Sequence, residues 1–101
     1  NDDTGTTSSS LSGISKRSKR EWNFDEKGTV TADIKIDISD ATGHSGSISA
    51  ASNYKLLFKT CEFCNFLELE TGDSASGDVI TFSNVTIQDG IFCIASADSN
   101  L

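Results

Sequence analysis

Apolar and polar residues alternate along residues 29–39, and this alternation is the clearest pattern in the chain. The apolar positions are Val30, Ala32, Ile34, Ile36 and Ile38. Because successive side chains of a strand point to opposite faces, the pattern predicts one long strand with an apolar face and a polar face. We expect the core of the protein to form against the apolar face.

The stretch before this strand alternates in the same way. Trp22 and Phe24 share one parity with Arg20, in a segment that runs from residue 16 to residue 26. The two aromatic side chains are therefore expected to face the core, with the stem of Arg20 at its margin. Lys27 and Gly28 predict a hairpin-like turn into the long strand.

The second half of the chain predicts further strands, separated by segments of loop composition at 40–52 and 71–77. The expected strands cover residues 53–60, 66–70, 78–87 and 91–95. The apolar positions change parity after Phe82, which predicts a β-bulge or a bend in that strand. Asp89 and Gly90 predict a hairpin turn into the last strand. This last strand is apolar on both parities, as expected of a central strand that is covered on both sides.

The chain shows no sustained helical period, so we predict an all-β protein. The expected fold is an Ig-like or related antiparallel β-sandwich of six to eight strands. The 101 residues are enough for one small domain, which we place at residues 11–101. Residues 1–10 are small and polar and are expected to form a linker or an extended N-terminal segment. Leu11 and Ile14 are the first apolar anchors after it.

The charge and the apolar runs of the chain exclude two classes of partner. The formal net charge is −7, and half of the eight basic residues lie in one short run: Lys16, Arg17, Lys19 and Arg20. A nucleic-acid surface needs a broad basic patch, so we expect no nucleic-acid partner. No apolar run approaches the roughly 18 residues that span a bilayer, so we expect no membrane insertion. The chain does not begin with Met, which is typical of a processed product or of part of a longer chain.

Cys61 and Cys64 form the sharpest local motif. A thioredoxin-type redox pair would need a helix after the first cysteine, and a structural zinc site would need about four ligands, whereas the chain has three Cys and one His. We therefore expect a small structural disulfide between Cys61 and Cys64, as is common in extracellular proteins. Cys93 is then a free, buried thiol. A bridge from Cys93 to Cys61 or Cys64 is the competing arrangement.

Other residues give weaker chemical signals. Asp37, Asp40 and Asp89 lie at strand ends and are calcium candidates, although turn chemistry explains aspartates at such places equally directly and is the interpretation we favour. No cofactor is expected. Asn84 begins the glycosylation sequon Asn-Val-Thr. His44 stands in a loop without an evident catalytic partner, so we expect no enzyme activity.

Several motifs together resemble a known family. They are Lys19-Arg20-Glu21-Trp22, Gly28-Thr29-Val30-Thr31, Tyr54-Lys55-Leu56-Leu57, and Gly77 to Val85 followed by Asp89-Gly90. This set is similar to β-sandwich modules of Bacteroidetes cell-surface and secreted proteins, of the adhesin-like type associated with type IX secretion. The resemblance implies an extracellular or cell-surface location and supplies no catalytic residue. In such bacteria, Asp73-Ser74-Ala75 would match a short O-glycosylation signal at Ser74. The chain departs from the family at residues 61–64, where similar modules often have an Asp/Gly-rich loop.

These observations favour a non-catalytic structural or adhesive module of a bacterial surface protein. The expected partners are neighbouring domains or identical subunits, because a sandwich with an exposed edge can accept an extended strand from a neighbour. Residues 1–15 are the candidate donor strand. The alternative is a module that binds surface glycans through Trp22 or Tyr54, although the parity of both side chains places them toward the core.

Overall fold

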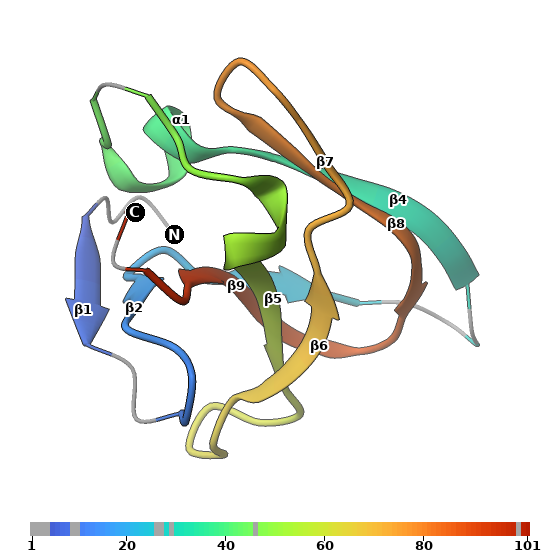
Figure 1. The fold of residues 1–101 in the computed structure, drawn as a ribbon. Coiled ribbons are helices and arrows are strands. Elements are labelled where there is room, and N and C mark those ends of the chain that lie inside the picture. Colours follow the sequence, from blue (N-terminus) through green and yellow to red (C-terminus); the bar gives the residue numbers. More distant parts are fainter. Residues whose placement is uncertain (1–4, 9–10, 26–27, 29, 46, 99) are drawn as a thin grey trace.

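The chain folds into two antiparallel β-sheets that pack as a sandwich (Figure 1). The computed structural model describes residues 5–8, 11–25, 28, 30–45, 47–98 and 100–101. In this part of the chain the elements are β1 (Thr6–Ser8), β2 (Lys16–Ser18), β3 (Trp22–Phe24), β4 (Val30–Asp37), α1 (Ile38–Thr42), the 3-10 turn η1 (Ala51–Asn53), β5 (Tyr54–Lys59), β6 (Leu67–Thr71), β7 (Ser74–Ser76), β8 (Val79–Ile87) and β9 (Gly90–Ser96). The predicted all-β sandwich is confirmed, and the described strands number nine rather than six to eight.

The larger sheet is built around β9. Its strand order is β1-β2-β9-β5-β6, and β3 also pairs with β9. β2 and β3 share one side of β9, because β2 pairs with its Ser96 end and β3 with its Gly90 end. The smaller sheet has the order β4-β8-β7. None of the described helices is long and apolar enough to span a membrane.

Buried apolar side chains form two clusters, one on each face of the larger sheet. The cluster between the sheets includes Tyr54, Leu56, Phe58, Ile80, Phe82, Val85, Phe92 and Ile94, with Trp22 and Phe24 packed against it. The outer cluster contains Ile14, Leu57, Phe66, Cys93 and Ala95. The expectation that β9 is covered on both sides is therefore confirmed, and so is the inward placement of Trp22 and Phe24.

The predicted parity change in β8 is a β-bulge. Ala32 pairs with Val85 and Ile34 with Phe82, so that two residues of β8 lie opposite Asp33 alone. Asn84, one of the two, has a left-handed backbone (φ 56°), and its N–H donates to the carboxylate of Asp33 (3.1 Å). The bulge lets the apolar residues on both sides of it face the same core.

The long strand is shorter than predicted and less covered. It ends at Asp37, and Ile38 begins α1 instead of continuing the strand. The carboxylate of Asp37 accepts hydrogen bonds from the N–H of Asp40 (3.1 Å) and the hydroxyl of Ser39 (2.8 Å), which makes it the N-cap of the helix. At the other end of β4, Val30 is 42% exposed and Ala32 is also exposed, so only the Ile36 end of the apolar row meets the core.

Both predicted hairpin turns, at Gly28 and at Asp89-Gly90, are wrong. β3 pairs with β9 while β4 pairs with β8, so the connection through Gly28 crosses from one sheet to the other. The Asp89-Gly90 turn likewise joins β8 of the smaller sheet to β9 of the larger one. Gly90 is required there by close approach, because a Cβ would lie 2.6 Å from the carbonyl oxygen of Lys59. Lys27, which was part of the predicted turn at Gly28, lies outside the described residues.

The first segment folds onto its own domain. β1 lies inside the predicted linker and pairs with β2, with Thr6 opposite Ser18. Ile14 is buried, and the N–H of Ser15 donates to the carbonyl of Ser96 (2.9 Å). The hypothesis that residues 1–15 are a donor strand for a neighbour is therefore wrong for the described part of this segment. Residues 1–4 and 9–10 lie outside that part.

The capping role of Asp37 leads to a first prediction. Its hydrogen bonds from Ser39 and Asp40 hold the pKa of its carboxyl below the usual value of 3.8. We expect Asp37→Ala to lower the melting temperature at pH 7. Asp37→Asn is expected to melt close to wild type, because asparagine caps a helix equally well. A lowered folded-state pKa stabilises the protein above the unfolded pKa, and this contribution is lost as pH falls through the folded value. Equal melting temperatures for Asp37→Ala and wild type at pH 7, measured by circular dichroism, would contradict this role.

Candidate functional site

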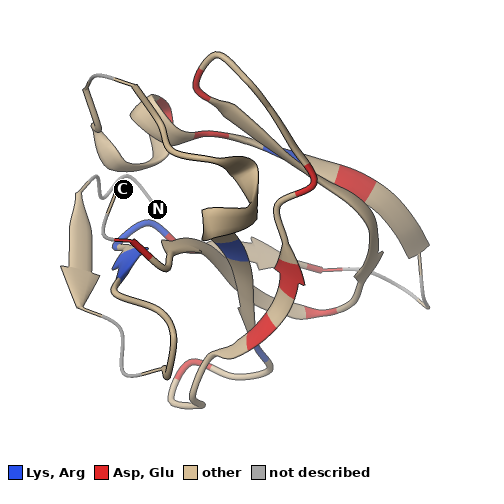
Figure 2. Cartoon of the chain, in the orientation of Figure 1, with Lys and Arg blue, Asp and Glu red and all other residues tan. Residues whose placement is uncertain are grey.

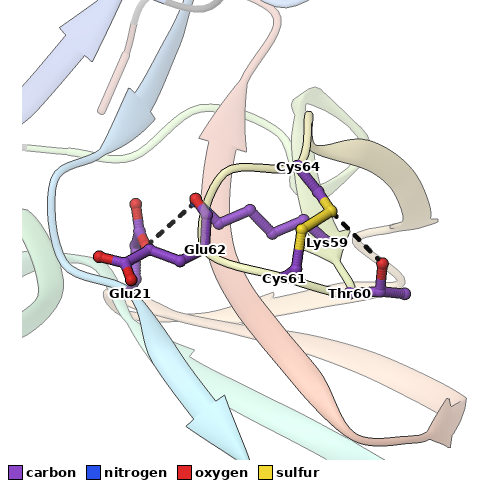
Figure 3. The surroundings of a disulfide bond; sticks show 6 residues. All are labelled: Glu21, Lys59, Thr60, Cys61, Glu62 and Cys64. Carbon is purple, nitrogen blue, oxygen red and sulfur yellow. Dashed lines mark hydrogen bonds and ion pairs between the residues drawn. A yellow bond between two sulfur atoms is a disulfide. The ribbon is translucent and has the colours of Figure 1, made fainter.

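A disulfide and a backbone hydrogen bond both close the loop between β5 and β6. Cys61 and Cys64 form a disulfide with their Cα atoms 5.1 Å apart, which confirms the predicted pairing. The N–H of Cys64 also donates to the carbonyl of Cys61 (3.1 Å), and the hydroxyl of Thr60 donates to the sulfur of Cys64 (3.7 Å; Figure 3). The four residues 61–64 thus form a cross-linked turn with little conformational freedom.

This turn presents an aromatic side chain to solvent. Phe63 is 94% exposed, and its neighbour Glu62 is exposed as well. Leu67, at the start of β6, is 65% exposed. Single exposed apolar residues are common, but an aromatic ring at the tip of a cross-linked turn suits a contact residue, because little backbone entropy remains to be lost on binding. We call residues 61–64 the disulfide loop.

The base of the disulfide loop is fixed by a buried lysine. Lys59 is only 8% exposed, and its ammonium donates to the carbonyl of Glu62 (3.0 Å; Figure 3). The same Nζ lies 3.6 Å from a carboxylate oxygen of Glu21 and 4.5 Å from the ring centre of Phe66. A buried ammonium requires such compensation, since desolvation of an unpaired charge is costly.

Arg17 completes this cluster from the other side. Its guanidinium lies 3.3 Å from the second carboxylate oxygen of Glu21 and 4.9 Å from the ring centre of Phe66. Glu21 therefore bridges two cations, and the ring of Phe66 contacts both of them. We call Arg17, Glu21, Lys59 and Phe66 the bridging cluster. It ties the β2–β3 connection to the end of β5. It was not visible in the sequence, because Arg17 and Glu21 lie far along the chain from Lys59 and Phe66.

Cys93 lies beneath this cluster and is not part of a reactive site. It is fully buried and free, as expected. Desolvation by burial raises the pKa of its thiol from 9.0 to about 12, which outweighs the attraction of the nearby Arg17 charge. The thiol therefore stays protonated at neutral pH and packs as a small apolar side chain.

A second surface feature is a groove between β3 and β4. Its volume is about 330 Å³, and its lining includes Trp22 and Phe24 on one side and Ile34 and Ile36 on the other. Charged residues stand among them: Arg20, Lys35, Asp37 and Asp40. Arg20 and Asp40 approach each other to 3.7 Å. The groove combines apolar walls with a few polar groups, which is the usual composition of a small-ligand site. We call it the β3–β4 groove.

The structure does not bring the three calcium candidates together. Asp37 ends β4 and caps α1, and Asp40 lies in the first turn of α1 and pairs with Arg20. Asp89 follows the end of β8 that pairs with Val30, at the opposite end of β4. Among the described residues no group of three or more His, Cys, Asp or Glu side chains is placed to hold a metal ion.

The remaining candidates are separate from one another. Asn84 and Ser74 are both exposed, on β8 and β7. Tyr54 is fully buried, and its hydroxyl donates to the carbonyl of Asn100 (2.8 Å) and accepts from the N–H of Ser49 (3.1 Å), so it offers no surface to a sugar. Trp22 is half-buried and reaches the β3–β4 groove. A ring nitrogen of His44 lies 3.4 Å from the carbonyl oxygen of Ser47, within its own loop.

The bridging cluster leads to a second prediction. Glu21→Gln leaves the buried Lys59 and the neighbouring Arg17 without their shared carboxylate, and we expect a loss of about 1–2 kcal/mol in the free energy of unfolding. Glu68→Gln is the matched control, because Glu68 pairs with Lys55 (3.5 Å) while its own side chain is 49% exposed. Urea unfolding at pH 7 compares the two variants. Equal losses would show that the bridging cluster is no more than a surface ion pair.

No protein-family model matches this chain, and searches of curated proteins and of solved structures gave no match either. The resemblance to surface modules of Bacteroidetes therefore remains an expectation from the sequence. Two surfaces carry the functional interpretation: the disulfide loop and the β3–β4 groove.

Proposed function

We propose that this chain is a non-catalytic adhesive and structural β-sandwich module of an extracellular bacterial surface protein. Its contact surface is the disulfide loop. The observation that carries this proposal is the 94% exposure of Phe63 at the tip of a turn that is closed by a disulfide and anchored through Lys59. Such a ring on a rigid support fits an apolar pocket on a partner.

The energetics of such a contact are favourable. Transfer of one exposed phenylalanine side chain into an apolar pocket contributes about 1.5–3 kcal/mol. The gain is largely retained, because the disulfide and the Cys61–Cys64 hydrogen bond order the turn before binding. The disulfide also supports an extracellular location, since such bonds persist in oxidising compartments.

The charge distribution also supports a protein partner rather than a nucleic acid. Basic residues gather on β2 and the segment that follows it, while acidic residues are spread over β4, β6 and most of the loops (Figure 2). Arg17, from this small basic group, and Lys59, at the end of β5, are engaged in the bridging cluster. They support the disulfide loop instead of forming a basic patch.

Adhesion of coated beads tests the proposal. Beads that carry the chain are applied to surfaces coated with individual extracellular-matrix proteins and with whole bacterial cells. We expect adhesion to at least one surface, and we expect Phe63→Ala to weaken it by about tenfold, which corresponds to about 1.4 kcal/mol. Val30→Ala is the matched control, because it removes an exposed apolar side chain elsewhere in the chain. No adhesion by wild type, or equal adhesion by Phe63→Ala, would reject the disulfide loop as the contact.

A glycan-binding module is the second candidate, and the β3–β4 groove favours it. Trp22 offers an aromatic wall there, and Arg20 and Asp40 offer hydrogen-bonding groups beside it. Aromatic walls with a few convergent polar groups suit sugars, whose faces are apolar and whose hydroxyl groups need partners.

A glycan array separates this candidate from the first. If the groove binds sugars, wild type binds a defined set of glycans and Asp40→Asn binds the same set more weakly, because a charged acceptor is lost. The side chain of Asp40 is 82% exposed, so this substitution leaves the core intact. Phe63→Ala is expected to bind glycans as wild type does. An array without any bound glycan would reject the second candidate.

A further inference from the structure

β4 is a long strand with one open side. Its eight residues pair with β8 on one side, and none of the described strands pairs with it on the other (Figure 1). Residues 30–33 are all exposed, including the apolar side chains of Val30 and Ala32. An open edge of this length presents unpaired N–H and C=O groups, which is the usual template for addition of another strand.

We propose that β4 pairs antiparallel with β4 of a second copy of this chain, about a two-fold axis at Ile34. In this register Ile34 faces its own counterpart. Asp33 then lies opposite Lys35 of the second copy, and Lys35 opposite Asp33 of the second copy. The contact is self-complementary, as a two-fold symmetric interface must be.

Side-chain pairing selects this register from its neighbours. A slip of one residue would turn the apolar row of one copy to the opposite face of the joined sheet. A slip of two residues in one direction would place Asp33 opposite Asp33, and in the other direction Lys35 opposite Lys35. Like charges directly opposite each other destabilise a strand pair, whereas opposite charges stabilise it. Among these registers, the one centred on Ile34 alone avoids all three penalties. A register centred on Ile36 would also pair Lys35 with Asp37, but it would join only residues 35–37 of each strand, because β4 ends at Asp37.

The same register also joins the apolar rows of the two copies on one face of the sheet. Ala32 of each copy lies opposite Ile36 of the other, so both apolar rows share one face of a continuous sheet that runs β8-β4-β4-β8. Ile34 and Ile36 already line the β3–β4 groove together with Trp22 and Phe24. A strand added beside β4 would extend this apolar surface and cover part of the row that the core of one copy leaves exposed.

The other described edges are poorer candidates. β1, β3 and β7 have three residues each. β6 has five, and its outer charges are Glu68 and Glu70. Pairing β6 with itself about Leu69 would place these two glutamates opposite each other, and such like-charge pairs are unfavourable. Charged residues on an edge normally prevent sheet association. On β4, a lysine beside an aspartate permits one symmetric pairing while opposing the others.

This inference goes beyond the proposed function, because it does not involve the disulfide loop. Sedimentation equilibrium of the full chain at physiological ionic strength tests it. We expect a monomer–dimer equilibrium with a dissociation constant in the micromolar to millimolar range. Lys35→Asp replaces both cross-strand ion pairs by like-charge pairs, and we expect it to weaken the dimer by about tenfold or more. Lys35 is exposed, so the fold should be retained, as a thermal melt will show.

A mixing experiment tests the register itself. Asp33→Lys alone is also expected to dimerise more weakly than wild type, whereas a mixture of Lys35→Asp with Asp33→Lys should form a heterodimer, because each Asp then faces a Lys. A thermal melt of Asp33→Lys checks its fold, since the carboxylate of Asp33 also accepts from the N–H of Asn84 at the bulge. The wild-type dimer must persist in Phe63→Ala, which keeps this result separate from the adhesion test. A wild type that stays monomeric up to about 1 mM, or a dimer that Lys35→Asp does not weaken, would overturn the proposal.

Discussion

Burial of β9 on both faces is the constraint on which the rest of this structure depends. The inner face of β9 packs through Phe92 and Ile94 against the smaller sheet, and its outer face carries Cys93 and Ala95. A small two-layer sandwich has no third sheet to cover that outer face. The chain covers it with Ile14 from the N-terminal segment and Phe66 from the loop after β5. These two segments are thus parts of the core.

The form of the disulfide loop follows from this covering role. Phe66 must turn inward to cover the outer face, and it lies under the cations of Lys59 and Arg17. The cations need a carboxylate, which Glu21 supplies from the opposite connection. The chain between Lys59 and Phe66 is therefore held at both ends, and the disulfide closes the turn that remains. Phe63 lies at the tip of this turn and is exposed.

Local patterns in the sequence predicted most features that depend on residues close together in the chain. The strands β5 and β9, the bulge near Asn84 and the Cys61–Cys64 bond all follow from residues close together in the chain. Pairing partners do not, since the Asp89-Gly90 turn has the same chemistry whether it joins neighbouring strands or two sheets. The helix α1 had a usable signal, because Asp37 is followed three residues later by an acid, as in many helix starts. The long alternation that runs into it concealed that signal.

The candidate site was likewise predictable only where it depends on residues close together in the chain. The disulfide was visible in the spacing of its two cysteines. The cluster that supports it was not, because Glu21 and Lys59 meet only after β3 and β5 have both paired with β9. The exposure of Val30 was hidden as well, since a strict alternation predicts which side chains share a face and leaves open how far the opposite sheet extends over them.

The open edge of β4 and the β3–β4 groove share side chains, and this links the two uses of that surface. Ile34 lies at the centre of the inferred strand pair and also in the wall of the groove. A ligand that fills the groove beside Trp22 would occupy the space next to the edge that a second copy needs. By thermodynamic linkage, a ligand that binds only the monomer weakens dimerisation by the factor by which dimerisation weakens its own binding. The disulfide loop shares no residue with this surface, so adhesion through Phe63 remains compatible with either state.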